Sequence, residues 1–199
     1  MICFDFDGVI ADSLPLWEKS CRQAAAEQGL TLPPEMRPFS RLDPLTFVQL
    51  AQDLGLHPQT FNNRMAELAQ AHASDIAVFP AMAEVLAQLA SRHSLAVISA
   101  SRSAFIERFL SAHGLSVLFS EILGGDRHQG KAAALLSLPS PRAMIGDAKS
   151  DIDAARKAGV ASIAVTWGWQ GPEMLAKANY VVQTPEALPG IIDSMFGQA

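Results

Sequence analysis

The stretch Asp5-Phe6-Asp7-Gly8-Val9-Ile10-Ala11-Asp12-Ser13 follows a short apolar run near the start of the chain. The run predicts a buried strand, and the side-chain period of two points Asp5 and Asp7 the same way where that strand ends. Two carboxylates this close require either a cation between them or a shared proton. Gly8 allows a sharp turn and a close approach of the backbone to a ligand. An acidic turn without function would give the same pattern, so the rest of the chain decides between the two.

Three further polar positions follow, each after an apolar run or at the start of a helix. Residues 95–98 lead into Ser99, Lys131 begins a helical stretch, and residues 143–145 lead into Gly146-Asp147-Ala148-Lys149-Ser150-Asp151. Each element is weak alone, and Lys131 by itself would be taken for a solvated lysine at a helix end. All four elements in this order make a chance match improbable. Because the carboxyl ends of parallel strands share one edge of a sheet, we expect these side chains to converge on one site.

The four elements resemble the signature of the haloacid dehalogenase (HAD) superfamily, and the resemblance spans nearly the whole chain. Phosphatases of that superfamily carry D-x-D-G-[TV]-[LI], then a Ser or Thr after a second strand, a Lys at the head of a helix, and G-D-x-x-x-D. The resemblance implies a phosphoric monoester hydrolase, similar to the phosphoglycolate phosphatase-like group, that acts on a small phosphorylated metabolite. It also implies an aspartyl-phosphate intermediate and a helical cap over the site.

The same resemblance implies catalytic roles for four residues. Asp5 would be the nucleophile, and Asp7 would protonate the departing alkoxide and later activate water. Ser99 would hold the phosphoryl oxygens, and Lys131 would neutralise the nucleophile and the phosphate together.

Several acids at one site require a hard cation, and ligands that are all oxygen favour Mg²⁺. The expected metal residues are Asp5, Asp7 through its backbone carbonyl, Asp147, and Asp151 one helical turn farther on. The expected substrate-binding residues are Gly8, Ala100, Arg102 and Arg41.

Some neighbouring residues have expectations of their own. Arg37 and Arg41 lie in or beside a proline-rich loop, where they could hold a second anionic group of the substrate or could simply be surface arginines. Asp12 is expected to cap the following helix. His128 is expected to be an ordinary solvated loop residue, and packing is the expected role of at least one of Trp167 and Trp169.

The chain divides into a core and an insertion. From about residue 92 onward short apolar strands alternate with amphipathic helices, which predicts an α/β fold with a doubly wound parallel sheet, Rossmann-like in its arrangement. Strands are expected at 95–98, 121–123, 143–145, 162–165 and 180–182. Residues 14–79 show helical spacing at 17–26, 47–54 and 65–73 and no convincing strand. We therefore predict a catalytic core of residues 1–13 and 80–199 and a small inserted α-helical cap of residues 14–79.

The bulk properties limit the partners. A length of 199 residues with 49% hydrophobic content suffices for a packed core, and a net charge of −5 offers no basic surface for nucleic acid. No apolar run approaches the roughly 20 residues that a membrane span requires. Two cysteines without metal-ligand spacing fit buried, reduced thiols. We expect a cytoplasmic protein that is a monomer or a weak homodimer.

Two alternatives to the phosphatase stay open. A sugar-phosphate mutase of the same fold is one, because Ser99-Ala100-Ser101-Arg102 resembles that branch and the Lys131 motif lacks the prolines that often follow it. A phosphoacceptor signalling domain is the other, although it has no use for a helical insertion after its first strand. A dehalogenase is disfavoured because dehalogenases of this superfamily lack the second acid, which is Asp7 here.

Overall fold

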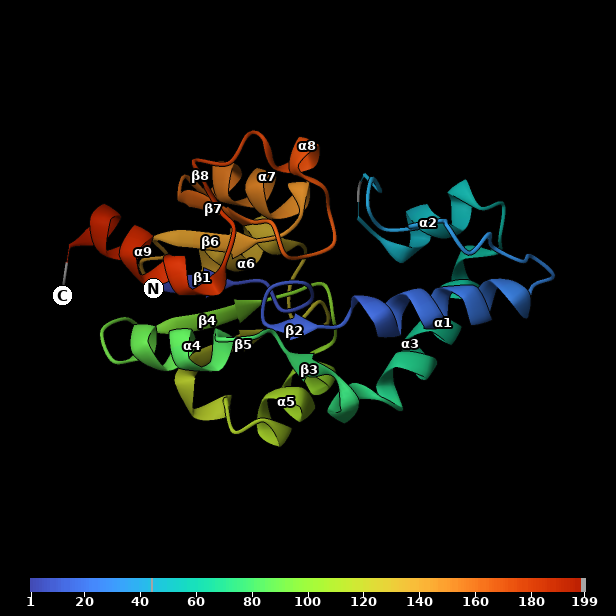
Figure 1. The fold of residues 1–199 in the computed structure, drawn as a ribbon, viewed down its shortest axis with the longest axis horizontal. Helices are drawn as coiled ribbons and strands as arrows, with labels where there is room; N and C mark the ends of the chain where they lie inside the picture. Colours follow the sequence, from blue (N-terminus) through green and yellow to red (C-terminus); the bar gives the residue numbers. More distant parts are fainter. Residues whose placement is uncertain (44, 198–199) are drawn as a thin grey trace.

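The computed structural model describes residues 1–43 and 45–197, and its centre is a six-stranded sheet with the order β5-β4-β1-β6-β7-β8 (Figure 1). All neighbouring strands run parallel. The strands are β1 (Ile2–Phe4), β4 (Leu95–Ile98), β5 (Phe119–Leu123), β6 (Ala143–Gly146), β7 (Ala161–Val165) and β8 (Tyr180–Val182). The chain builds outward from β1 on one side and then on the other, so the strand order reverses beside β1. Such a reversal is where open α/β sheets bind their ligands.

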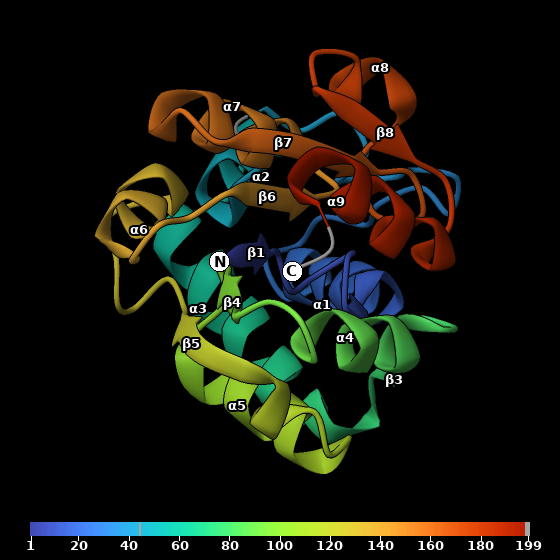
Figure 2. The same cartoon turned by 90° about the vertical axis from the view of Figure 1, so that its left-hand side faces the viewer.

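Helices cover both faces of the sheet, as Figure 2 shows from the side of the chain ends. Ile2 and Phe4 belong to one apolar cluster and Cys3 to another, because successive strand side chains point to opposite faces. The core helices are α4 (Met82–Ala90), α5 (Ser103–Ala112), α6 (Lys131–Ser137), α7 (Lys149–Ala158), α8 (Pro172–Leu175) and α9 (Leu188–Phe196). Short 3₁₀ turns lie at η1 (Ala73–Asp75), η2 (Ser116–Leu118) and η3 (Pro185–Ala187). The expected doubly wound α/β fold is confirmed.

Three helices of the insertion lie beyond the carboxyl edge of the sheet: α1 (Leu14–Ala26), α2 (Phe47–Asp53) and α3 (Pro58–Gln70) (Figure 1). The helix starts follow from local chemistry. Pro15 lies in the first turn of α1 and Pro58 begins α3, where a missing N–H costs nothing, and the Thr46 hydroxyl accepts the Gln49 N–H at the start of α2. α3 packs against both other helices. Their apolar faces meet through buried Cys21, Leu50 and Met65.

A two-stranded antiparallel ribbon joins the insertion to the core. Ala11 of β2 (Ala11–Asp12) pairs with Val78 of β3 (Ala77–Val78). The expectation of no strand in this segment is wrong at β3, because two residues are too few to display a period. Asp12 does not cap α1 either: it is exposed within β2, and Ser13 holds the N-cap position. The cap boundaries of 14 and 79 stay a prediction.

Among the described residues, no helix is long and apolar enough to cross a membrane.

Both cysteines are buried free thiols. Cys3 lies within the central strand and Cys21 within α1, and each is 0% exposed. Burial disfavours the thiolate and raises the pKa of Cys3 to about 12 and that of Cys21 to about 11. At pH 8 both groups are therefore protonated in the folded protein.

We predict that neither thiol of the native protein reacts with 5,5′-dithiobis(2-nitrobenzoate) at pH 8, because only the thiolate attacks a disulfide. In guanidinium chloride, which unfolds the protein and exposes both thiols, both should react immediately. Absorbance at 412 nm counts the thiols. Reaction of either thiol in the native protein at the rate of free cysteine would contradict the burial described here.

Candidate active site

Three neighbouring strands deliver polar groups to one edge of the sheet. β1 leads into Asp5, β4 into Ser99 and β6 into Asp147, and β1 is hydrogen-bonded between the other two. The backbone continues the ladder for one more residue, since the Asp5 N–H donates to the Ile145 carbonyl at 2.8 Å. All three side chains are buried. The convergence expected from the sequence is therefore present in the fold.

Lys131 bridges two of the acids. Its Nζ lies 2.6 Å from Asp5 Oδ2 and 2.5 Å from Asp151 Oδ1, and its side chain is only 12% exposed. Burial by itself lowers the pKa of the ammonium, but the charges of Asp151 and Asp5 outweigh it and leave that pKa raised. The lysine is therefore firmly protonated and is not the solvated residue that its place at a helix start would suggest.

Asp5, Asp147 and Asp151 form a compact acidic cluster, with one carboxylate oxygen of each within 4.8 Å of the others. Burial, followed by the charges of Asp5 and Asp151, raises the pKa of Asp147 well above its ordinary value. Burial also raises the pKa of Asp151 to about 6 against the opposing charge of Lys131. One ammonium does not balance three buried carboxylates. The donor set is entirely oxygen and suits a hard divalent cation such as Mg²⁺.

Asp7 turns its carboxylate away from this cluster. Oδ1 accepts hydrogen bonds from Ser13 Oγ at 2.6 Å and Trp17 Nε1 at 2.8 Å, and Oδ2 accepts one from Ser101 Oγ at 2.5 Å. Burial raises the pKa of Asp7 despite these three bonds, and the charge of Asp5 adds to the rise. The side chain that was expected to carry protons is thus protonated more readily than an exposed aspartate. Its expected metal contact, the backbone carbonyl, stays a prediction.

Backbone groups hold the outer acids in place. The Trp169 N–H donates to Asp147 Oδ2 at 2.6 Å, and the Ala148 N–H donates to Asp151 Oδ2 at 3.1 Å. Glycines permit this close approach: a Cβ on Gly8 or Gly168 would overlap the Asp147 carboxylate. Gly8, expected to bind substrate, is therefore placed against Asp147, and its φ of +75° also favours glycine.

A cavity of about 520 Å³ opens above these groups, between the core loops and the insertion. Core residues form its floor, and among them are Asp5, Asp7, Ser99, Ala100, Arg102, Lys131 and Asp147. The insertion supplies the opposite wall, which includes Trp17, Phe47, Val48, Asn62, Asn63, Ala66 and Gln70. A small molecule in this cavity could therefore contact both the acids and the insertion.

The two arginines of the proline-rich segment lie elsewhere. Arg41 is 82% exposed and pairs with Glu173 at 3.3 Å. The Arg37 guanidinium approaches the Pro34 carbonyl on the surface, and neither arginine is among the described residues that line the cavity. In this structure, then, the fold brings Arg102 to the cavity and leaves Arg41 outside it.

Several residues at the site have no sequence signal. His128 was expected to be solvated, but its Nδ1 accepts the Gly130 N–H at 3.0 Å, so its Nε2–H donates to the Ser99 carbonyl at 3.0 Å. It ties the loop of Lys131 to that of Ser99. Ser13, Trp17 and Ser101 are partners of Asp7 that no pattern indicates, since the sequence does not show that the start of α1 turns its side chains back to Asp7 or that Ser101 lies beside it. Trp169 lines the cavity, whereas Trp167 donates to the Val9 carbonyl at 3.2 Å.

Comparison with known proteins decides the family. Residues 2–165 match the model of the haloacid dehalogenase-like hydrolases. The chain belongs to this family. A phosphoglycolate phosphatase from Synechococcus elongatus is 31% identical over 211 residues, with 99% of each chain covered. The expected phosphoric monoester hydrolase is thereby confirmed.

Solved structures support the fold of this HAD-like hydrolase. A predicted phosphatase from Clostridium acetobutylicum superposes with a TM-score of 0.84 at 21% identity, with 97% of each chain covered. A Thermotoga maritima protein assigned as a β-phosphoglucomutase has a TM-score of 0.70 at 22% identity, with 98% of this chain and 99% of that one covered. At such identities the likeness concerns the fold alone.

We predict that Gly168→Ala impairs the acidic cluster, because its Cβ would overlap the Cβ and carboxylate of Asp147. A displacement of about 1 Å typically costs on the order of 10²-fold in rate. Isothermal calorimetry should show weaker Mg²⁺ binding, and phosphate release should fall in parallel.

Gly190→Ala is the matched control, since a Cβ there meets nothing within 4 Å in the exposed start of α9. It should leave both readouts intact and stabilise the helix by about 0.5–1 kcal/mol. Equal behaviour of the two variants would refute the packing argument.

Proposed function

We propose that the protein hydrolyses the phosphate monoester of a small metabolite by way of a phosphorylated Asp5. The observation that carries the proposal is the bridge from Lys131 to Asp5 and Asp151 at the floor of the cavity. The ammonium orients the Asp5 carboxylate, and it would attract the incoming phosphoryl group. Asp7 lies two residues away with a raised pKa, which suits a proton donor.

The reaction would proceed in two displacements. A carboxylate oxygen of Asp5 attacks phosphorus, the bond from phosphorus to the ester oxygen breaks, and the proton of Asp7 passes to the departing oxygen. Water then attacks phosphorus, Asp7 takes one of its protons, and the bond from Asp5 to phosphorus breaks to release inorganic phosphate. Asp7 regains its proton and Asp5 its charge, so one turnover restores both residues.

Asp5, Asp147 and Asp151 would hold Mg²⁺, together with the Asp7 carbonyl. The ion would supply positive charge to the phosphoryl oxygens and to the acids themselves. The chain's own groups complete the site: Ser99 would donate its hydroxyl to the phosphoryl group, and the Trp169 N–H keeps Asp147 aimed at the cluster.

The relatives' name suggests a substrate that carries a second anionic group. Phosphoglycolate joins a carboxylate to the phosphate ester, and Arg102 offers a guanidinium at the cavity wall. Arg102 makes no ion pair with any described residue. We infer that Arg102 contacts the carboxylate. The buried free thiols are also compatible with a cytoplasmic enzyme, which we take to be a monomer or a weak homodimer.

A sugar-phosphate mutase is the second candidate. The Ser99-Ala100-Ser101-Arg102 sequence resembles that branch. The amides of Asn62 and Gln70 on the cap wall could bind a sugar's hydroxyl groups. A mutase would return phosphate to a sugar, so the release of inorganic phosphate distinguishes the two.

We predict that Asp5→Asn abolishes phosphate release, because the amide is a poor nucleophile and the lysine loses a charged partner. Asp12→Asn, exposed in β2, is the control and should keep wild-type turnover. Malachite green detects the phosphate, and circular dichroism checks the fold. Turnover of Asp5→Asn near that of wild type would exclude Asp5 as the nucleophile.

A second prediction concerns the acid group of the substrate. Arg102→Ala should lower kcat/KM for phosphoglycolate at least tenfold, a charge-assisted hydrogen bond being worth about 1.5–3 kcal/mol. The kcat/KM for 4-nitrophenyl phosphate should change by less than about threefold, because that ester has no carboxylate to accept the hydrogen bond. Arg41→Ala should change neither value, since Arg41 faces Glu173. Equal losses on both esters would remove Arg102 from substrate recognition.

A further inference from the structure

The donors that hold Asp7 come from both parts of the protein. Ser101 belongs to the core loop after β4, Ser13 immediately precedes α1, and Trp17 lies one helical turn into α1. The Trp17 Nε1–H donates to Asp7 Oδ1 at 2.8 Å. The acid of the proposed reaction is therefore bonded to a side chain of the insertion, across the boundary between the insertion and the core.

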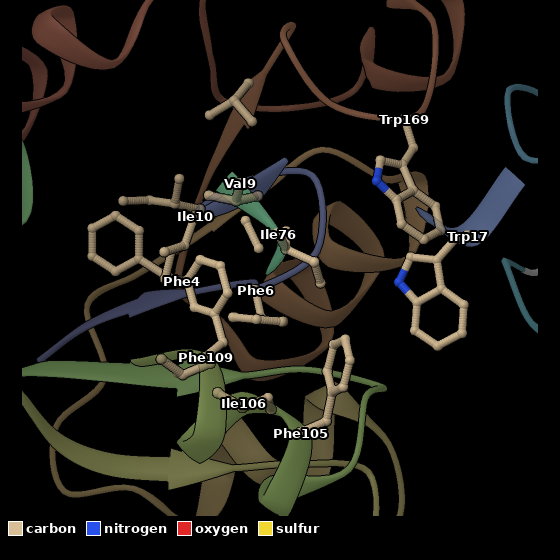
Figure 3. Packing of buried hydrophobic residues seen from close by; sticks show 14 of the residues in the cluster. Phe4, Phe6, Val9, Ile10, Trp17, Ile76, Phe105, Ile106, Phe109 and Trp169 are labelled. Atoms are coloured by element: carbon tan, nitrogen blue, oxygen red, sulfur yellow. The ribbon is translucent and has the colours of Figure 1, made fainter. Parts of the chain in front are cut away.

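The indole of Trp17 is itself packed between the two parts. Its ring centroid lies 4.8 Å from that of Phe47 in α2 and 5.8 Å from that of Phe105 in α5. Figure 3 shows Trp17 beside Phe105, with its nitrogen on the side of the indole that faces Phe6. The residue is 5% exposed. The indole N–H can hold this position only while α1 and α2 rest against the core.

The two connections between the insertion and the core pair with each other in the ribbon of β2 and β3. Ser13 follows β2 directly and stays close to that ribbon during any rotation about it. Trp17 lies a helical turn farther out, so the same rotation moves the indole more than the Ser13 hydroxyl. Opening of the cap would therefore break the Trp17 bond to Asp7 before the others.

We propose that Trp17 is a positioning residue that orients the Asp7 carboxyl for proton transfer only when the cap is closed. This inference rests on the proposed role of Asp7 as the proton donor. The Asp7 carboxyl is then aligned when the cap closes, and it is misaligned while the cap is open.

The two oxygens of Asp7 have different partners, so the orientation of the carboxyl decides which oxygen carries the proton. Oδ1 accepts two hydrogen bonds, from Ser13 and Trp17, and is thereby occupied as an acceptor. Among the described residues Oδ2 has one partner, the Ser101 hydroxyl, which donates to the carboxylate and can turn to accept from the protonated acid. Oδ2 is thus the oxygen that carries the proton toward the departing ester oxygen. Without Trp17 the carboxyl can rotate and exchange the two oxygens.

The leaving group supplies a test that a purely structural role would not satisfy. An alkoxide needs a proton as it departs, whereas 4-nitrophenolate is a stable anion and does not. Trp17→Phe keeps an aromatic ring of similar packing and removes the N–H. We expect kcat/KM for an alkyl ester, 2-phosphoglycolate or glycerol phosphate, to fall at least tenfold, which is part of the roughly 10²–10⁴ that general acid catalysis supplies. This constant covers only the steps through departure of the ester oxygen, whereas the later proton transfer from water to Asp7 is common to all esters. The kcat/KM for 4-nitrophenyl phosphate should change by less than about threefold, since departure of 4-nitrophenolate does not use the acid.

Trp167→Phe is the matched control, because it also removes an indole N–H, here from a bond to the Val9 carbonyl. Whatever its general effect, it should change the two esters by the same factor. If Trp17→Phe does not fold, Trp17→Met fills the space with a flexible side chain and should give the same selective loss.

A second readout needs no turnover. In metal-free protein, the unfolding midpoints in urea of Trp17→Phe, Asp7→Ala and the double variant should be non-additive, because both single changes remove the same bond. Additive midpoints, or equal losses on both esters, would overturn the inference. Failure of the wild-type protein to release phosphate from any ester would instead refute the proposed function and leave the thermodynamic cycle as the test of the bond.

Discussion

Two buried carboxylates, Asp5 and Asp151, share the single ammonium of Lys131, and most of the site follows from that constraint. Removing three charged groups from water costs far more than their attraction returns unless each is held by further hydrogen bonds. The chain supplies those bonds from its backbone: the Phe6 N–H reaches Asp5 and the Ala148 N–H reaches Asp151. The lysine therefore serves two purposes, since it stabilises the folded loops and orients the proposed nucleophile.

The sequence was sufficient for the core because its signals are local. Short apolar runs bounded by helices predict a parallel sheet, and the polar residue after each run must lie at the carboxyl edge. Asp5, Ser99 and Asp147 could be found in this way, and Lys131 from its place at a helix start in the same ordered set of motifs. The residues around Asp7 could not, because Ser13 and Trp17 at the start of α1 and Ser101 after β4 meet it from two separate segments. The placement of Arg41 shows the same limit: its guanidinium faces Glu173, a partner 132 positions away that no pattern couples to it.

The insertion is attached to the core by more than its ribbon. Gln170 is 3% exposed, and it donates to the Leu42 carbonyl while accepting the Lys149 N–H. It lies beside Trp169, whose N–H fixes Asp147. The loop that contains Trp169 and Gln170 thus contacts the insertion and also positions Asp147. A movement of the insertion that shifts Gln170 would therefore also disturb Asp147.

The paired strands β2 and β3 have a consequence for how this architecture can change. Because Ala11 pairs with Val78, the chain leaves the core and returns to it at neighbouring points, about 5 Å apart as in any antiparallel pair. The length of polypeptide between those points hardly affects the core, since the entropy of closing a loop grows only with the logarithm of its length. The insertion is in this sense an interchangeable module. A lineage could lengthen, shorten or replace it, and so alter which molecules reach the acids, without moving the strands that hold Asp5 and Asp147.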